Sequence, residues 1–225
     1  MHACTRRSRN LGPVLLAFDT ATPAVTVALF DGEDVVAERT VVDAMRHGEL
    51  LAPGIEAVLA EAGVVRQDLT AVAVGVGPGP FTGLRVGLVT ARTLGAVLDI
   101  PVYGVCTLDV LAAEAVETGT VSGPYHVATD ARRKEVYWAS YDADGLRLAG
   151  PDVVRPAAVA TSEPVVGRGA VLYPDSFPDG RGPENPSASV LAQVVAQERA
   201  ELYDPEPMYL RRPDAAEPHK PKRVS

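Results

Sequence analysis

Short apolar runs separated by turn residues dominate the first part of the chain. Residues 14–18, 24–30 and 35–41 are each apolar enough to predict a strand, and Asp31 with Gly32 predicts a tight hairpin turn between the second and the third. Three consecutive strands joined by such short turns predict an antiparallel meander at the start of the fold.

Helical periodicity begins after this meander. Apolar residues recur every three or four positions, which predicts an amphipathic helix, at Leu51, Ile55, Val58, Leu59 and Ala62. Further along, the pattern predicts a strand, a helix, a strand and a helix at residues 71–76, 82–98, 100–105 and 108–117. Helices that alternate with strands favour the α/β class.

The pattern restarts more weakly in the second part of the chain. Residues 125–129 and 135–141 predict another hairpin, and residues 187–199 predict a helix that closes the fold. Residues 145–186 are rich in glycine and proline with only short apolar segments, which leaves the boundaries there open. Residues from 207 onward predict an extended or disordered tail. Together these elements predict an α/β protein built from two related halves.

Composition narrows the class of protein. The chain has 225 residues, of which 47% are hydrophobic, so it can bury a substantial core in one large or two modest domains. No apolar stretch approaches the roughly 20 residues of a membrane span, and the first residues lack the apolar core of a signal peptide. We therefore expect a cytoplasmic protein without membrane contact. Cys4 and Cys106 are too few for a disulfide framework or a cysteine zinc site.

Charge is unevenly distributed along the chain. The net charge is −8, but residues 1–12 carry three arginines and no acid, and residues 211–225 carry five basic and two acidic residues. The body between these segments carries 13 basic and 27 acidic residues, a net charge of −14. Because Lys and Arg supply much of the affinity for nucleic acid, we expect any contact with RNA to be indirect or confined to the tails.

A loop rich in glycine and proline, residues 75–83, connects a predicted strand to a helix. Such a loop at a helix N-terminus can hold a phosphate. The candidate residues for a phosphate or nucleotide, in this loop and in the first strand-to-strand turn, are Asp19, Thr20, Gly77 and Gly79. However, Pro80 stands where the dinucleotide fingerprint needs its third glycine, and no Gly-Lys-Ser/Thr follows. The alternative is a sharp turn whose polar side chains bond local amides.

Small residues at a spacing of four form a stripe along the predicted helix at residues 82–98. They are Gly83, Gly87, Ala91 and Gly95. Each glycine inside a helix costs about 1 kcal/mol relative to alanine, so the stripe indicates that another backbone approaches closely. That backbone belongs either to the protein's own sheet or to a helix of another subunit. In the second case the apolar contacts would come from Leu84, Leu88 and Leu98, which flank the stripe.

Searches of the sequence for metal ligands and nucleophiles give no candidate. The four histidines are His2, His47, His126 and His219, and none has a histidine or cysteine three or four residues away. The Gly-x-Ser-x-Gly motif of hydrolase nucleophiles does not occur. The residues alone therefore require neither an enzyme nor a resident cofactor.

Several motifs together resemble the TsaB (YeaZ) family. They are LAFDTAT at residues 16–22, RHGELLAP at 46–53, GPGPFTGLRVG at 77–87, PVYGVCTL at 101–108, DARRKEVY at 130–137 and YLR at 209–211. The segment at 77–87 is the most specific, and the resemblance covers residues 13–214. It implies the two-lobed α/β fold of actin, Hsp70 and sugar kinases, with a mixed sheet flanked by helices in each lobe.

The same resemblance implies a division of the chain. The N-terminal lobe is expected at residues 13–106, and the C-terminal lobe at residues 107–210. The N-terminal lobe is implied to carry the dimerisation face, formed by the stripe on the 82–98 helix and by the apolar face of the 50–62 helix with Leu51 and Ile55. A disordered extension at residues 1–12 and a disordered basic tail at residues 211–225 are expected on either side.

The resemblance also implies a role beside TsaD, the catalytic sister protein in tRNA threonylcarbamoyladenosine biosynthesis. In TsaD a His-x-x-x-His pair after a similar glycine-rich segment binds the active-site metal, and Thr107 and Leu111 stand at those two positions here. Neither is an equivalent ligand, which implies a non-catalytic subunit. The implied partners are TsaD and the ATPase TsaE, with a homodimer when alone and tRNA reached only through the complex. A nucleotide at the interface of the complex is a further candidate ligand.

Two other functions stay open at this point. One is a small-molecule kinase or ATPase of the same fold, which would use Asp19 and the glycine-rich loop. The other is a free-standing metallopeptidase, which would need the ligands that Thr107 and Leu111 replace.

Overall fold

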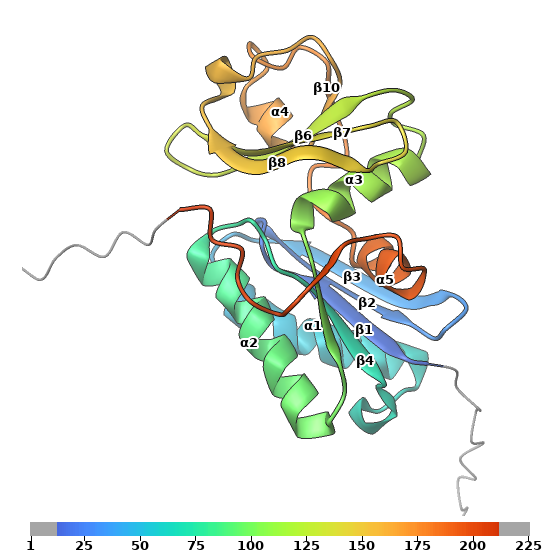
Figure 1. Ribbon diagram of the computed structural model, residues 1–225. Helices are drawn as coiled ribbons and strands as arrows, with labels where there is room; N and C mark the ends of the chain where they lie inside the picture. The colour runs from blue at the N-terminus through green and yellow to red at the C-terminus, as the bar shows by residue number, and fades with distance from the viewer. Residues whose placement is uncertain (1–12, 212–225) are drawn as a thin grey trace, which may run out of the picture.

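The structure, a computed structural model, describes residues 13–211 and has two lobes with one β-sheet each (Figure 1). The first lobe contains, in chain order, β1 (Leu15–Asp19), β2 (Ala24–Phe30), β3 (Val35–Val42), α1 (His47–Ala62), the 3₁₀ helix η1 (Arg66–Asp68), β4 (Ala71–Gly75), α2 (Phe81–Leu98) and β5 (Val102–Val105). The second lobe contains α3 (Thr107–Glu117), β6 (Tyr125–Asp130), β7 (Val136–Tyr141), β8 (Arg147–Val154), the 3₁₀ helix η2 (Pro156–Ala158), β9 (Val165–Val166), α4 (Arg168–Leu172) and β10 (Gly180–Arg181). The last elements are α5 (Ala188–Ala196) and β11 (Leu202–Tyr203).

The two sheets repeat one topology. The strand order is β3-β2-β1-β4-β5 in the first sheet, with β11 added beyond β5, and β8-β7-β6-β9-β10 in the second. In both sheets three strands form an antiparallel meander, and the next strand pairs in parallel with the first strand of that meander. The predicted α/β class with two related halves is therefore confirmed, and each sheet is mixed.

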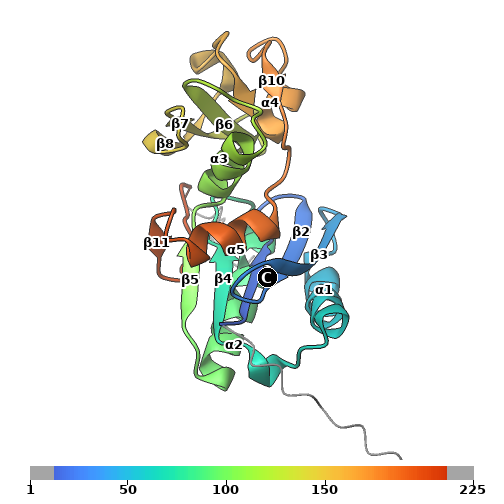
Figure 2. The same cartoon turned by 90° about the vertical axis from the view of Figure 1, so that its right-hand side faces the viewer.

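Both faces of the first sheet are buried, which explains its continuous apolar strands. In β1, Leu16 and Phe18 pack into the core beneath α1 and α2, whereas Leu15 and Ala17 pack on the other face beneath α5. Figure 2 shows α5 lying across this second face. Successive side chains of a strand point to opposite faces, so a strand covered on both faces is apolar at every position.

The chain returns to the first lobe before it ends. Helix α5 packs on the first sheet, and β11 pairs antiparallel with β5. Beyond β11 the backbone N–H of Met208 donates to Val76 O (2.8 Å), and Arg211 donates to Ala131 O in the second lobe (3.2 Å). We therefore propose that residues 188–208 belong with the N-terminal lobe rather than with residues 107–187. The extension at 1–12 and the tail at 212–225 lie outside the described residues.

Glu114 joins the two lobes at the start of α5. This α3 carboxylate accepts a hydrogen bond from the backbone N–H of Ser187 (3.1 Å), the residue that caps α5. The pKa of Glu114 is raised from 4.5 to about 7, mainly by burial, while the Ser187 N–H lowers it and the neighbouring Glu38 and Glu117 raise it. The folded protein therefore takes up a proton at Glu114 near neutral pH.

We predict that Glu114 makes the stability of the protein depend on pH. Because its folded pKa is the higher one, the folded state holds more protons than the unfolded state between pH 4.5 and about 7. The contribution of Glu114 to the free energy of unfolding therefore falls as the pH rises through this window. Urea unfolding at several pH values should show this slope, and Glu114→Gln should flatten it. An equal slope in Glu114→Gln would assign it to other groups.

Candidate functional site

Asp19 lies fully buried at the end of β1 and faces α3 rather than solvent. Its carboxylate accepts hydrogen bonds from Thr107 Oγ1 (2.7 Å) and from the backbone N–H of Ala21 (2.6 Å). Burial raises the pKa of Asp19 above its ordinary value, and these two hydrogen bonds oppose that rise. Asp19 therefore connects the first turn to α3 within the core.

Close packing fills the space beside Asp19 where a phosphate was predicted. A Cβ placed on Gly75 would lie 1.8 Å from Asp19 Oδ2, and one placed on Gly79 would lie 2.2 Å from the backbone oxygen of Ala21. Gly77 has φ +92°, a conformation that side chains rarely adopt. This packing gives no support to a phosphate held by Asp19, Gly77 and Gly79, which stays a prediction. These glycines let the loop lie directly on the β1–β2 turn.

Thr20 links the same turn to α2. Its hydroxyl donates to Gly83 O (2.8 Å) and accepts from the backbone N–H of Gly87 (3.1 Å). The Thr20 side chain is 1% exposed, so it too is occupied by the protein's own backbone. The candidate phosphate residues thus connect β1, the glycine-rich loop and α2 by hydrogen bonds and close packing.

Thr107 and Leu111 lie in the interior. By resemblance, these are the two positions at which TsaD has its metal-binding histidines. Both are fully buried, Thr107 bonded to Asp19 and Leu111 in the core between α3 and the second sheet. Within residues 13–211, no group of three or more His, Cys, Asp or Glu side chains is arranged to hold a metal ion.

The stripe of small residues on α2 faces the protein's own first lobe. A Cβ on Gly83 would lie 2.6 Å from Thr20 O, one on Gly87 2.5 Å from Thr20 Oγ1, and one on Gly95 2.4 Å from a methyl of Val102. The other residues predicted for a partner interface are also core residues: Leu51, Ile55, Leu84, Leu88 and Ala91. These contacts favour the packing alternative, and the assignment of the residues to a subunit contact stays a prediction. Although α2 is apolar enough by length and composition to cross a membrane, its inner face is core.

The opposite face of α2 is exposed and apolar. Val89 and Val97 have 63% and 75% of their surface exposed. With the chain segment after β11 they line a groove of about 670 Å³, whose other lining residues are Arg85, Leu88, Arg92, Thr93, Ala96, Glu206, Pro207 and Tyr209. Positions 89, 93 and 97 have the same spacing of four as the buried stripe, so periodicity alone did not distinguish the inner face from the outer one.

The C-terminal segment completes this outer face. Tyr209 stacks on Phe81 with ring centroids 5.3 Å apart, and Arg85 donates to the Tyr209 hydroxyl (2.8 Å) while lying 3.4 Å from the centre of the Phe81 ring. Arg92 forms an ion pair with Glu206 (2.8 Å). Sequence reasoning noted the YLR motif at 209–211 but not its contact with α2, because 124 residues separate Arg85 from Tyr209.

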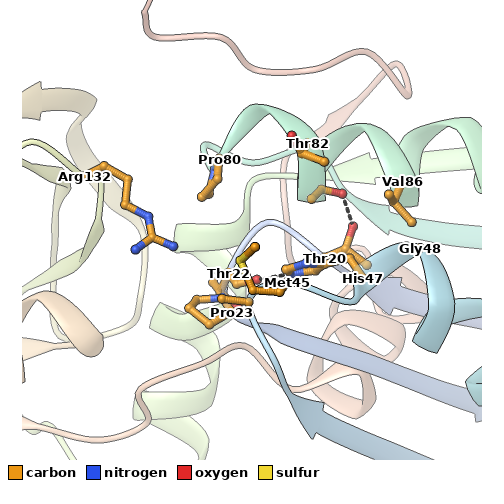
Figure 3. Close-up of a pocket in the computed structure, with 12 residues that line it drawn as sticks. Thr20, Thr22, Pro23, Met45, His47, Gly48, Pro80, Thr82, Val86 and Arg132 are labelled. Carbon is orange, nitrogen blue, oxygen red and sulfur yellow. Dashed lines mark hydrogen bonds between the residues drawn. The ribbon is translucent and has the colours of Figure 1, made fainter.

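A cavity of about 200 Å³ lies beside the β1–β2 turn (Figure 3). From the first lobe it is lined by Thr22, the start of α1 and the first turn of α2, and from the second lobe by Arg132 in the β6–β7 turn. The ring nitrogen Nε2 of His47 lies 2.7 Å from Thr22 O and donates to it. Sequence reasoning did not single out Arg132 for this cavity, because only the fold brings residues 22, 82 and 132 together.

The chain is similar to proteins of one family. Residues 38–173, more than half of the chain, match the family model of TsaD, tRNA N6-adenosine threonylcarbamoyltransferase. An uncharacterized protein of Mycobacterium tuberculosis is 45% identical over 206 residues, which cover 89% of this chain and 93% of that protein. The Escherichia coli tRNA threonylcarbamoyladenosine biosynthesis protein TsaB is 37% identical over 130 residues, which cover 58% of this chain and 55% of that protein.

Two solved structures from Pseudomonas aeruginosa resemble both lobes. YeaZ superposes with a TM-score of 0.75 at 29% identity, covering 88% of this chain and 100% of that one. An uncharacterized protein with similarity to peptidase YEAZ superposes with a TM-score of 0.76 at 30% identity, covering 89% and 100%. The expected actin-like two-lobed fold is thus confirmed. From its sequence relatives and its fold alike, the chain belongs to the TsaB (YeaZ) family.

Proposed function

We propose that this protein is a non-catalytic subunit in the biosynthesis of threonylcarbamoyladenosine in tRNA. The observation that carries this proposal is the burial of Thr107 and Leu111 within the core. In the sister transferase, by resemblance, the corresponding positions hold the metal. A chain that keeps the scaffold without the ligands is suited to bind the catalytic subunit rather than to replace it. Two of its relatives are named tRNA threonylcarbamoyladenosine biosynthesis protein TsaB.

The exposed face of α2 is the surface that we propose for the TsaD-type partner. Val89 and Val97 are apolar and exposed, while Arg85 and Arg92 are held in place by Tyr209 and Glu206. An apolar centre with an ordered polar rim is the usual composition of a protein interface. We propose that the isolated chain self-pairs through the same face, and that TsaE joins the complex in the cytoplasm.

Contact with tRNA is assigned mainly to the partner in this proposal. The body of the chain carries a net charge of −14, which opposes binding to a phosphate backbone. The alternative of a kinase or ATPase that uses Asp19 loses support, because Asp19 is enclosed by Gly75 and Thr107.

Reconstitution of the modification reaction tests the proposal. We predict that TsaD, TsaE, tRNA and an enzyme that makes the threonylcarbamoyl donor form modified adenosine only when this protein is added. This protein without TsaD should form none. Mass spectrometry of digested tRNA measures the product. Equal product with and without this protein would refute the subunit role, and product formed without TsaD would show that the chain is itself catalytic.

A further inference from the structure

Arg147, the first residue of β8, lies where the second lobe meets the end of the chain. Its side chain is only 15% exposed, and its Nε lies 3.5 Å from the carboxylate of Asp109 in the first turn of α3. Tyr141 donates to the same carboxylate (2.8 Å). Burial raises the pKa of Asp109, and the positive charge of Arg147 opposes this rise most strongly. A buried charge is costly unless it is paired, so Asp109 fixes the guanidinium within the second lobe.

A second nitrogen of the same guanidinium faces β11, the strand added to the first sheet. Arg147 Nη2 donates to the Tyr203 hydroxyl (2.6 Å) and to the Glu201 carboxylate (2.8 Å). The Tyr203 hydroxyl in turn donates to Glu201, and the Tyr203 side chain packs against the cores of both lobes. One arginine of the second lobe therefore holds two side chains at β11.

The pairing of β11 within the first sheet is short. The strand has two residues, which pair with β5 as Leu202 with Val105 and Tyr203 with Gly104. A segment with few backbone hydrogen bonds opens more readily than a long strand does. We therefore expect the side-chain contacts of Arg147 to contribute strongly to the position of β11.

The chain after β11 completes the exposed face of α2. It runs antiparallel to the helix (Figure 1), because Glu206 pairs with Arg92 and the later Tyr209 binds the earlier Arg85. Glu206 lies three positions after Tyr203, and an extended chain spans at most about 3.6 Å per residue. A movement of β11 is therefore passed on to the residues that line the α2 groove.

We propose that Arg147 positions the partner surface from the second lobe, because it holds β11 and β11 sets where residues 206–209 lie on α2. This inference rests on the proposed function, since it takes the α2 face to be the surface for the TsaD-type partner. Arg147 itself lies outside the lining of the α2 groove. The affinity for the partner then responds to the second lobe, although the surface belongs to the first, which is a coupling between separate regions.

Hydrogen exchange of the isolated full chain tests the first step. Arg147→Met removes the donors, so we expect the backbone amides within residues 202–209 to exchange about tenfold faster, the size expected for one lost hydrogen bond to a charged group. The amides of β1 and β2 should exchange as in the wild type, which checks that the variant folds. Unchanged exchange within residues 202–209 would overturn the proposal.

Arg168→Met is the matched control for the exchange experiment. It removes an arginine–glutamate pair of the same length, 2.8 Å to Glu184, away from β11. Residues 202–209 should therefore exchange as in the wild type, and equal acceleration by both variants would overturn the proposal. Arg147→Lys keeps the charge with a single donor nitrogen, so its exchange should lie between that of the wild type and that of Arg147→Met. If Arg147→Met does not fold, unchanged exchange in Arg147→Lys would overturn the proposal instead.

Calorimetric titration with TsaD tests the second step. Arg147→Met should weaken the affinity about tenfold, and Tyr209→Ala should weaken it as well, because it removes the contacts of this segment with Phe81 and Arg85. If both act through the same segment, the double variant should lose no more than the larger single loss. Additive losses would overturn the proposal, and so would wild-type affinity in Arg147→Met beside weak binding in Tyr209→Ala.

Failure of the proposed function gives a different pattern. Arg147→Met and Tyr209→Ala would both bind TsaD as the wild type does, while residues 202–209 of Arg147→Met still exchange faster. The partner surface would then lie elsewhere, and the role of Arg147 in partner binding would fall with it. Its hold on β11 would stand as measured by exchange.

Discussion

Replacing Gly79 by alanine is expected to lower the free energy of unfolding by about 3 kcal/mol, the upper range for overpacking a dense interior. The new methyl would lie 2.2 Å from the backbone oxygen of Ala21 and 2.8 Å from its carbonyl carbon and Cα. Backbone atoms cannot rotate away as a flexible side chain can. The turn that carries Asp19 and Thr20 must therefore shift, and with it the hydrogen bonds to Thr107 and to Gly83. Urea unfolding followed by circular dichroism measures the loss.

Gly48→Ala is the matched control for this prediction. A Cβ on Gly48, in the first turn of α1, meets no atom within 4 Å. Alanine is favoured over glycine in helices by up to about 1 kcal/mol, so this variant should be as stable as the wild type or slightly more stable. If Gly79→Ala also unfolds at the wild-type urea concentration, the glycine-rich loop is not tightly packed on the first turn. The space beside Asp19 would then be open to a ligand after all.

The first lobe was predictable because its strands are buried on both faces. A continuous apolar run such as residues 24–30 corresponds to β2, at the same bounds. The second lobe was not predictable in its later part, where β9 and β10 have two residues each. Its strands pack backbone against backbone, because a Cβ on Gly150 would lie only 2.6 Å from Trp138 O. Glycine and proline indicate that a segment is irregular, but they do not predict which strand it packs against.

The stripe on α2 shows what sequence periodicity can and cannot predict. Small residues at every fourth position indicated a close neighbour. The structure identifies it as the turn at Thr20 for Gly83 and Gly87, 63 residues before Gly83, and as residues 100–102 for Gly95. Spacing along one helix contains no information about which partner lies opposite. For the same reason the cavity at Arg132 could not be predicted, since its lining comes from three turns far apart in the sequence. Candidate sites formed by one segment can be read from a sequence, whereas sites between lobes need the fold.

A glutamate at Val89 is expected to break the association with TsaD without unfolding the chain. Val89 is 63% exposed at the groove on α2, so its replacement should change the free energy of unfolding by about 0.5 kcal/mol or less. At the centre of an interface the same charge would be desolvated without a partner, which costs about 2 kcal/mol or more, roughly a 30-fold loss of affinity. Calorimetric titration of TsaD into each variant measures this loss.

Leu148→Glu tests whether the effect belongs to α2. Leu148 is 62% exposed, almost equal to Val89, but it lies on β8 in the second lobe. It therefore introduces the same charge at the same exposure away from the proposed face, and its affinity for TsaD should match the wild type. Loss of binding in Leu148→Glu alone would move the partner surface to the edge of the second sheet. Normal binding in both variants would remove Val89 from the centre of the interface, because an unpaired charge at a desolvated central position lowers the affinity.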